Sequence, residues 1–198
     1  MAGRPRRIDD SAIYEAMIRV MGRTGPGAMT LAVVAEEAGV VPATLVQRFG
    51  SKRGLLLGLA EYSAGRSADL REQAQRDRRH PLDVLVELLV GTWDVATTPR
   101  EYANHLAFLC ADLTDAQFLE LTQESHRAQR ALLADLLRAS VDTGDLAGGT
   151  DIDALTATIE SVVVGAGVVW AVDPRGTLTD RLRAALESVL APHRTRTP

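Results

Sequence analysis

Residues 30–52 constrain the fold more than any other part of the chain, because they read as two short helices joined by a tight turn. Gly39 stands between them, where a sharp turn needs the positive φ that glycine adopts without steric cost. Ala35 allows the helices to approach closely, and Leu45 and Phe49 supply apolar side chains that pack the second helix across the first. The arrangement is a helix-turn-helix, whose second helix fits a DNA major groove.

Apolar residues recur at spacings of three and four along nearly the whole chain, and strand signals are weak. We therefore expect an all-α protein of about nine helices, with a three-helix head over residues 1–52 and a helical body over residues 53–198. The expected helices cover residues 9–23, 31–38, 42–48, 51–78, 100–112 and 115–143. Pro81 opens a further helix, and the last two follow Thr150 and Thr177.

Composition limits the cellular location of this chain, which has 198 residues, 46% of them hydrophobic. The polar, basic N-terminus lacks the apolar run of a signal peptide. The longest apolar run, residues 162–172, is about half of the roughly 20 residues that a bilayer span needs. Cys110 is the only cysteine, which leaves no internal disulfide and fits a reducing compartment. We expect a cytoplasmic protein that does not bind a membrane.

The net charge of −4 is unusual for a DNA-binding chain, but the charges are unevenly distributed. Residues 1–55 carry eight basic and five acidic side chains, a net of +3. The remainder carries 14 basic and 21 acidic side chains, a net of −7. A basic head on an acidic body suits one DNA-facing end.

These motifs together resemble the TetR family of bacterial transcriptional regulators. The match runs over residues 3–57: Gly-Arg-Pro-Arg at the start, the helix-turn-helix, and Phe-Gly-Ser-Lys at 49–52 followed by two leucines. A second match covers residues 160–194 and is similar to the C-terminal dimerisation helices of the family. The resemblance implies that residues 1–52 form the DNA-binding domain and residues 53–198 the ligand-binding and dimerisation domain.

Two positions depart from the family pattern. The family usually has serine or threonine at position 41, which caps the recognition helix, and tyrosine at position 46, which contacts a phosphate. This chain has Val41 and Val46, whose side chains do neither. The departure leaves open a member that binds DNA poorly or reads an unusual site.

The resemblance implies a homodimer that binds a palindromic operator in double-stranded DNA. Gln47 has the donor and acceptor for adenine, and Arg48 suits guanine or a phosphate. Lys52 starts a helix where a phosphate is also favoured by backbone N–H groups. Arginines on a Gly/Pro-containing arm enter the minor groove or follow phosphates, unless they form a disordered tail. The expected DNA-binding residues are Arg4, Arg6, Arg7, Thr30, Ala43, Thr44, Gln47, Arg48 and Lys52.

The resemblance also implies a pocket in the body for a small-molecule effector. Ligand sites are mostly apolar with a few polar groups, and most aromatic residues of the chain lie in the body. The alternative is that each aromatic is ordinary core. The expected ligand-binding residues are Tyr62, Trp93, Tyr102, His105, Phe108, Cys110, Phe118, His126 and Trp170. This mixture favours a hydrophobic or amphipathic ligand.

The last two helices are expected to form a four-helix dimer interface with their copies in a second chain. Small residues line one side of the first, and a leucine stripe follows the second. The alternative is a packing face within one chain. The expected interface residues are Val162, Gly165, Ala166, Val169, Leu178, Leu182, Leu186 and Val189.

Enzyme motifs are absent: the chain has no His-Glu-x-x-His, no paired-cysteine metal motif, no phosphate-binding glycine loop and no nucleophile elbow. We therefore expect neither catalysis nor a metal or other cofactor. His105, Cys110 and His126 are the remote candidates for a metal site or a thiol–imidazole pair. The expected function is a repressor that a small ligand releases from its operator. The second reading keeps the fold as a ligand-binding helical dimer, or a regulator acting through a protein partner.

Overall fold

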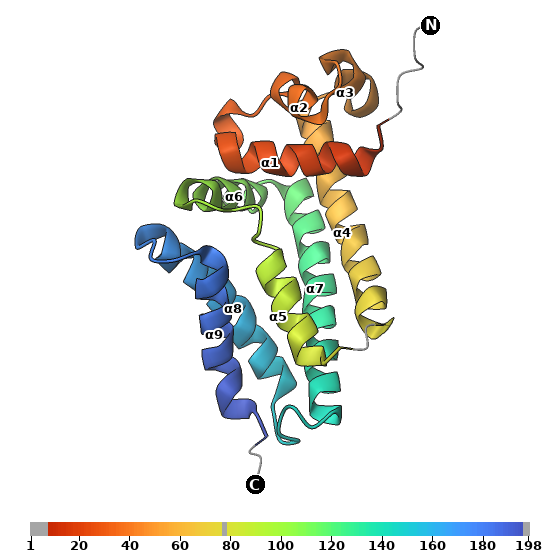
Figure 1. Ribbon diagram of the computed structural model, residues 1–198. Coiled ribbons are helices and arrows are strands. Elements are labelled where there is room, and N and C mark those ends of the chain that lie inside the picture. Colours follow the sequence, from red (N-terminus) through yellow and green to blue (C-terminus); the bar gives the residue numbers. More distant parts are fainter. Residues whose placement is uncertain (1–7, 77–78, 196–198) are drawn as a thin grey trace, which may run out of the picture.

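The computed structural model describes residues 8–76 and 79–195, and this part of the chain is all-α, as the sequence predicts (Figure 1). A single bridge between Leu146 and Arg194 is its only extended pairing. The helices are α1 (Asp10–Ala28), α2 (Leu31–Ala38), α3 (Pro42–Phe49), α4 (Lys52–Arg76), α5 (Pro81–Gly91), α6 (Pro99–Asp112), α7 (Ala116–Asp142), α8 (Ile152–Val172) and α9 (Leu178–Leu190), followed by the 3-10 turn Ala191–His193.

The head contains α1, α2 and α3, at the end of the molecule opposite the C-terminus (Figure 1). Gly39 adopts a φ of 68°, which reverses the chain between α2 and α3 as the turn chemistry predicts. Val34, Ala35 and Leu45 have no exposed area, so the two helices share one core with the buried side of α1. Glu37 of α2 pairs with two arginines of α1, at 2.8 and 2.9 Å.

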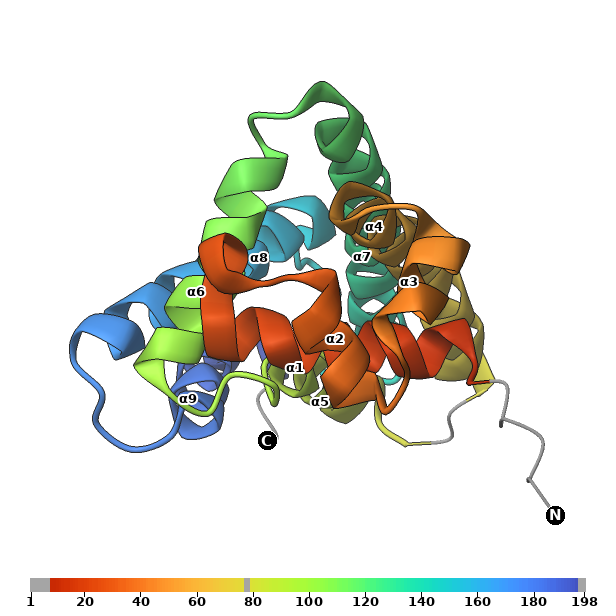
Figure 2. The same ribbon diagram turned by 90° about the horizontal axis from the view of Figure 1, so that it is seen from above.

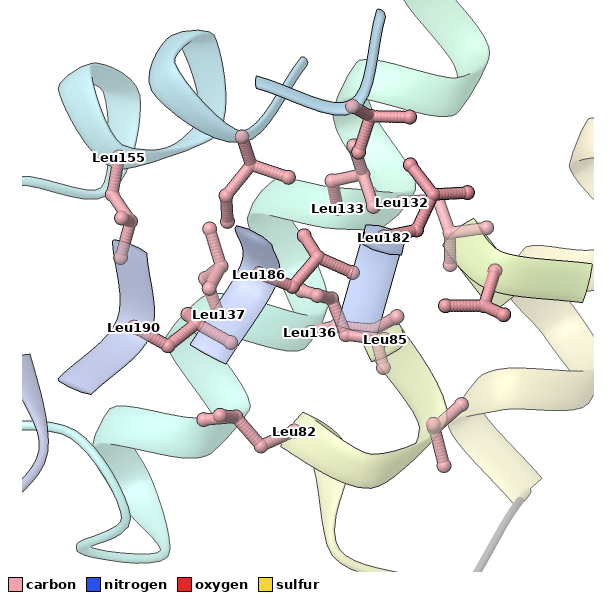
Figure 3. Packing of buried hydrophobic residues seen from close by; sticks show 14 of the residues in the cluster. Leu82, Leu85, Leu132, Leu133, Leu136, Leu137, Leu155, Leu182, Leu186 and Leu190 are labelled. Carbon is pink, nitrogen blue, oxygen red and sulfur yellow. The ribbon is translucent and has the colours of Figure 1, made fainter. Parts of the chain in front are cut away.

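The body is built around leucines of four helices (Figure 3). They come from α5, α7, α8 and α9 and pack into a continuous apolar cluster: Leu82, Leu85, Leu132, Leu133, Leu136, Leu137, Leu155, Leu182, Leu186 and Leu190. Burial of this much apolar surface is the main force that holds the body together.

The leucine stripe of α9 points into this core rather than outward. Leu178, Leu182 and Leu186 have 3%, 1% and 0% of their area exposed within one chain. The expectation that these three residues lie at a dimer interface is therefore corrected. The periodicity located an apolar face correctly, but α5 and α8 of the same chain cover that face.

Two junctions connect the head to the body. The long helix α4 leaves the head and packs along α7, and α1 lies across α6 (Figures 1 and 2). At the second junction Asn104 donates a hydrogen bond from Nδ2 to the carbonyl oxygen of Gly22, at 2.6 Å. At Gly25 the backbone of α1 kinks, with a φ of 70°, before the chain enters α2. Contacts of α1 with α6 and of α4 with α3 thus connect the body to the head.

Candidate DNA-binding surface, ligand cavity and dimer face

The recognition helix α3 packs against the head through Leu45 and Phe49 and presents most of its other side chains outward. Leu45 is fully buried, whereas Ala43 and Gln47 are exposed and Thr44 is half-buried. Val46 is 50% exposed, so half of this apolar side chain faces outward. The outer face of α3 thus offers small and apolar groups, one hydroxyl and one amide.

The start of α3 lacks a side-chain cap. Val41 occupies the N-cap position and is 65% exposed, and no side chain satisfies the first N–H groups of the helix. The N–H groups of a helix start that no side chain satisfies favour an anion such as a DNA phosphate. Thr30, by contrast, caps α2 by accepting a hydrogen bond from the Val33 N–H at 3.3 Å.

Of the five basic residues expected to contact DNA, the two that the structure describes, Arg48 and Lys52, are both engaged within the chain. Arg48 donates from Nη1 to the Ile8 carbonyl oxygen at 2.8 Å and to Asp10 at 2.9 Å. Lys52 donates from Nζ to the Pro26 carbonyl oxygen at 2.6 Å. Arg48 therefore fixes the point where the N-terminal arm begins, and Lys52 ties the start of α4 to the kinked end of α1. Arg4, Arg6 and Arg7 lie outside the described residues.

The charges of the head are partly neutralised on the side away from α3. Hydrogen bonds from Arg19 and Arg23 hold the pKa of Glu37 below its ordinary value. This carboxylate therefore stays ionised and keeps α1 and α2 in a fixed relation. Near α3, Arg48 is paired with Asp10, whereas Lys52 donates to a neutral backbone carbonyl oxygen and keeps its positive charge.

A cavity of about 200 Å³ lies at the junction of head and body, and we call it the junction cavity. It is bounded by α1, α4, α6 and α7. Its lining residues are Met21, Leu56, Leu59, Ala60, Ser63, Phe108, Asp112, Phe118, Leu121, Thr122 and Ser125. The walls are mostly apolar with a few hydroxyls and one carboxylate, which is the composition typical of a small-molecule site.

Of the nine residues expected to bind a ligand, Phe108 and Phe118 line the junction cavity. Most of the residues that line the cavity were not predicted from the sequence. The signal was present as helical spacing: residues 56, 59, 60 and 63 share one face of α4, and residues 118, 121, 122 and 125 share one face of α7. Spacing alone did not show that these two faces oppose each other.

The structure gives the other aromatic candidates structural contacts. Trp93 and Tyr102 pack with ring centroids 4.7 Å apart, and Tyr102 donates its hydroxyl to the Val164 carbonyl oxygen at 3.1 Å. The Trp170 indole donates to the Gly176 carbonyl oxygen at 3.2 Å. Tyr62 lies against Tyr14, with centroids 5.0 Å apart. None of these residues lines the cavity.

The polar candidates are also spread apart. Cys110 is exposed, and His126 lies 3.9 Å from Glu160 on the outside of α7. His105 packs against α1, where its buried Nε2 has no partner among the described residues. Burial lowers the pKa of His105. The structure does not assemble His105, Cys110 and His126 into a metal-ligating group within its described part.

The outer face of α8 and α9 is apolar and uncovered. A shallow groove of about 550 Å³ is lined by Val162, Gly165, Ala166 and Val169 of α8 and by three small residues and Arg181 of α9. Val169 is exposed on this groove, and three other valines of α8 are exposed as well: Val164, Val168 and Val172. Val189 is half-buried beside the core. By length and composition α8 is also the one helix of the described chain that is apolar enough to cross a membrane.

A helix-turn-helix head joined to a helical body, with a small and mostly apolar cavity at their junction, defines a DNA-binding regulator of the one-component type. The family models agree over most of the chain. Residues 13–59 match bacterial regulatory proteins of the tetR family, and residues 81–194 match the C-terminal part of a BetI-type transcriptional repressor. The chain belongs to the TetR family of DNA-binding transcriptional regulators.

Solved structures share the fold at low sequence identity. A putative TetR-family regulator from Rhodococcus sp. is 20% identical, with a TM-score of 0.67 over 93% of this chain and 97% of that chain. SmeT, the repressor of the Stenotrophomonas maltophilia multidrug efflux pump SmeDEF, is 19% identical, with a TM-score of 0.64 over 96% and 92%. A putative regulator from Saccharomonospora viridis in complex with choline is 20% identical, with a TM-score of 0.71 over 94% and 98%. No curated protein matches the chain.

Proposed function

We propose that the protein is a cytoplasmic, homodimeric repressor that a small hydrophobic or amphipathic ligand releases from a palindromic operator. The proposed control by a ligand rests on one observation: the junction cavity borders both contacts between body and head, α1 with α6 and α4 with α7. Met21 brings α1 to the cavity wall, and Leu56, Leu59 and Ala60 bring α4. Because α4 begins at Lys52, directly after the recognition helix, a ligand that moves α4 also moves α3.

Release follows from a difference in affinity between two arrangements. A ligand that fills the cavity favours the arrangement in which the cavity is widest, and DNA favours the arrangement whose heads fit two half-sites. To move the protein from almost fully DNA-competent to almost fully released, the ligand must favour the second arrangement by roughly 5 kcal/mol. Burial of a ligand of modest size in an apolar cavity supplies free energy of this order, since apolar surface contributes about 25 cal/mol per Å².

The size of the cavity limits the ligand. A cavity of about 150 Å³ accepts benzene, so one of about 200 Å³ accepts roughly ten non-hydrogen atoms. A neighbour from Saccharomonospora viridis was solved with choline, and FadR from Bacillus subtilis with stearoyl-CoA. A ligand of the size of choline fits the junction cavity without rearrangement, whereas a whole acyl-CoA does not.

Dimerisation is proposed through the exposed face of α8 and α9. Val162, Gly165, Ala166 and Val169 lie on it, and small residues there allow a second helix pair to approach closely. This apolar face is exposed in one chain, and its burial by a second chain accounts for the apolar character of α8 along its length. A partner copy that covers it forms a four-helix interface and holds two heads about one helical repeat of DNA apart.

On the DNA, Ala43, Thr44 and Gln47 are proposed to face the major groove, with Lys52 and Thr30 near phosphates. Val46 and Ala43 suit the methyl groups of thymine, and Gln47 suits adenine. We therefore expect A·T pairs at the contacted positions. Arg48 is proposed to act chiefly by positioning the arm that carries Arg4, Arg6 and Arg7, because its guanidinium already binds Ile8 and Asp10.

Selection of duplexes from a random library by the purified full-length chain tests this proposal. We expect enrichment of a palindrome with half-site centres about 10 base pairs apart, bound more weakly as salt rises. Failure to enrich any sequence, or binding that does not depend on salt, would contradict it. Those results would instead favour the second candidate, a ligand-binding dimer that acts through a protein partner. That candidate rests on positions 41 and 46, where valines replace the serine or threonine and the tyrosine that the family usually has.

A further inference from the structure

The junction cavity contains one ionisable side chain, Asp112, among walls that are otherwise apolar or carry hydroxyls. We propose that the cavity selects a small organic cation, an amine or quaternary ammonium with an apolar body, and that the carboxylate of Asp112 recognises the positive charge. The inference rests on the proposed ligand-controlled function and names the chemical class of the ligand.

The carboxylate of Asp112 is poorly compensated by the protein itself. Burial, and next the negative charge of Asp115, raises the pKa of Asp112. No basic residue of the described chain forms an ion pair with it. A half-buried charge without a partner is costly, and a cationic ligand removes that cost when it binds.

The position of Asp112 in its helix adds to the negative potential. Asp112 is the last residue of α6, and the last turn of α6 contains no basic residue. The C-terminal end of a helix carries partial negative charge on its free carbonyl groups, and cations are normally found there. A carboxylate at this place is therefore unfavourable for the folded chain alone and favourable for a bound cation.

Arg53, which contacts the cavity residue Phe118, does not neutralise the cavity. Arg53 forms a two-pronged ion pair with Asp115, with the shorter contact at 2.6 Å. Its guanidinium also lies 4.9 Å from the centre of the Phe118 ring. Arg53 is thus neutralised by Asp115, and the three charges at this edge of the cavity leave an excess of one negative charge.

The aromatic walls suit the same ligand class. Phe108 and Phe118 line the cavity, and a cation over a free aromatic face is attracted by the quadrupole of the ring. One face of Phe118 is already covered by Arg53, so Phe108 is the main aromatic contact for a ligand cation. A carboxylate or phosphate ligand gains nothing from these rings and is repelled by Asp112. The cavity therefore discriminates by charge as well as by size.

Three probes of nearly equal shape test the charge preference: phenyltrimethylammonium, tert-butylbenzene and phenylacetate, each with about ten non-hydrogen atoms. NMR titration of the DNA-free full-length protein measures each Kd. We expect phenyltrimethylammonium to bind at least about tenfold more tightly than the neutral isostere. Phenylacetate is expected to bind most weakly. Equal affinities, a preference for phenylacetate, or no binding of the cation would overturn the proposal.

A pair of variants assigns the preference to one side chain. Asp112→Asn should abolish the advantage of the cation over the neutral isostere. Glu120→Gln removes one exposed carboxylate from α7 outside the cavity and should keep that advantage. A cation preference that survives Asp112→Asn would contradict the assignment. If Asp112→Asn failed to fold, the comparison of the three probes on the parent protein would still decide the ligand class.

Titration of a selected duplex with the same probes separates this inference from the proposed function. A cation that binds selectively but leaves the DNA complex intact would contradict ligand release and keep the charge preference. Release by the neutral isostere at equal affinity would keep ligand release and contradict the charge preference.

Discussion

At the scale of single residues, Gly22 sets how closely α1 approaches α6. A Cβ atom built on Gly22 would lie 2.8 Å from His105 Nε2, closer than real contacts allow. Gly22→Ala should therefore force the histidine or the helix to shift and lower the free energy of unfolding by about 1–3 kcal/mol, measured by urea denaturation. Gly27→Ala is the matched control, because nothing lies within 4 Å of its built Cβ. Equal losses in both variants would show that the close approach is not the cause.

Lys52 and Gln47 should separate affinity from sequence preference. Lys52→Glu is expected to weaken binding to every duplex and to reduce the dependence on salt, because one phosphate-facing charge is reversed. Gln47→Ala is expected to change preference at one position of each half-site, by roughly 1–3 kcal/mol of discrimination. Gel-shift titrations over a set of operator variants measure both effects. Parent-like binding by both variants would refute the assignment of these residues.

The ion pair between Arg53 and Asp115 should make stability depend on acid pH. The hydrogen bond from Arg53 lowers the pKa of Asp115 from 3.8 to about 2. The folded state therefore binds this proton less readily than the unfolded state does, so the contribution is complete above about pH 4 and lost as pH falls through about 2. The stability difference between the parent and Asp115→Asn should accordingly shrink over that range in urea unfolding.

Asp94→Asn, which removes an exposed carboxylate elsewhere, controls for net charge. A difference for Asp115→Asn that stays constant down to pH 2 would mean that the lost ion pair is not the cause. Asparagine keeps the ability of this position to cap α7, where Asp115 now accepts from Gln117 and Phe118, so the variant isolates the charge.

At the scale of elements, the two sides of the α8–α9 pair should respond oppositely to substitution. Leu186 is fully buried within one chain, so Leu186→Ala should lower the free energy of unfolding by about 2–5 kcal/mol. Val169 is 49% exposed on the groove. Val169→Arg should leave the folded chain intact, as judged by circular dichroism, and prevent dimerisation, as judged by light scattering. A dimeric Val169→Arg variant would exclude this face as the interface.

Helices and turns followed from the sequence because their signals are local. Gly39 reverses the chain as its turn position requires, and Thr30 and Thr177 cap the helices that follow them. The pairing of apolar helix faces depends instead on residues that are far apart in the sequence. The stripe of Leu178, Leu182 and Leu186 is equally apolar whether it meets another chain or α5, and the fold alone decides.

The ligand cavity shows the same limit. Aromatic side chains suggested a pocket, yet Trp93, Tyr102 and Trp170 pack within the core and support α8. The cavity forms where four helices fail to fill the space between them, and most of its walls are leucine, alanine and serine. Residues of these types occur throughout the chain, and their spacing defines two helix faces without showing that those faces meet at a cavity.

At the scale of the whole molecule, the head is coupled to the body at two separated places. The α1–α6 contact is held by Asn104 and Gly22, and the α4–α7 contact includes the ion pair of Arg53 with Asp115. The junction cavity lies between these contacts and borders all four helices. A ligand there has mechanical access to the recognition helix without touching DNA, which is the physical basis of the proposed release.

The most direct test of the account is the number of chains bound to one selected duplex, measured by sedimentation equilibrium at a salt concentration that retains binding. The account predicts two chains per palindromic duplex, or a multiple of two, and loss of both together when one half-site is scrambled. One chain per duplex, with affinity unchanged by scrambling the second half-site, would contradict it.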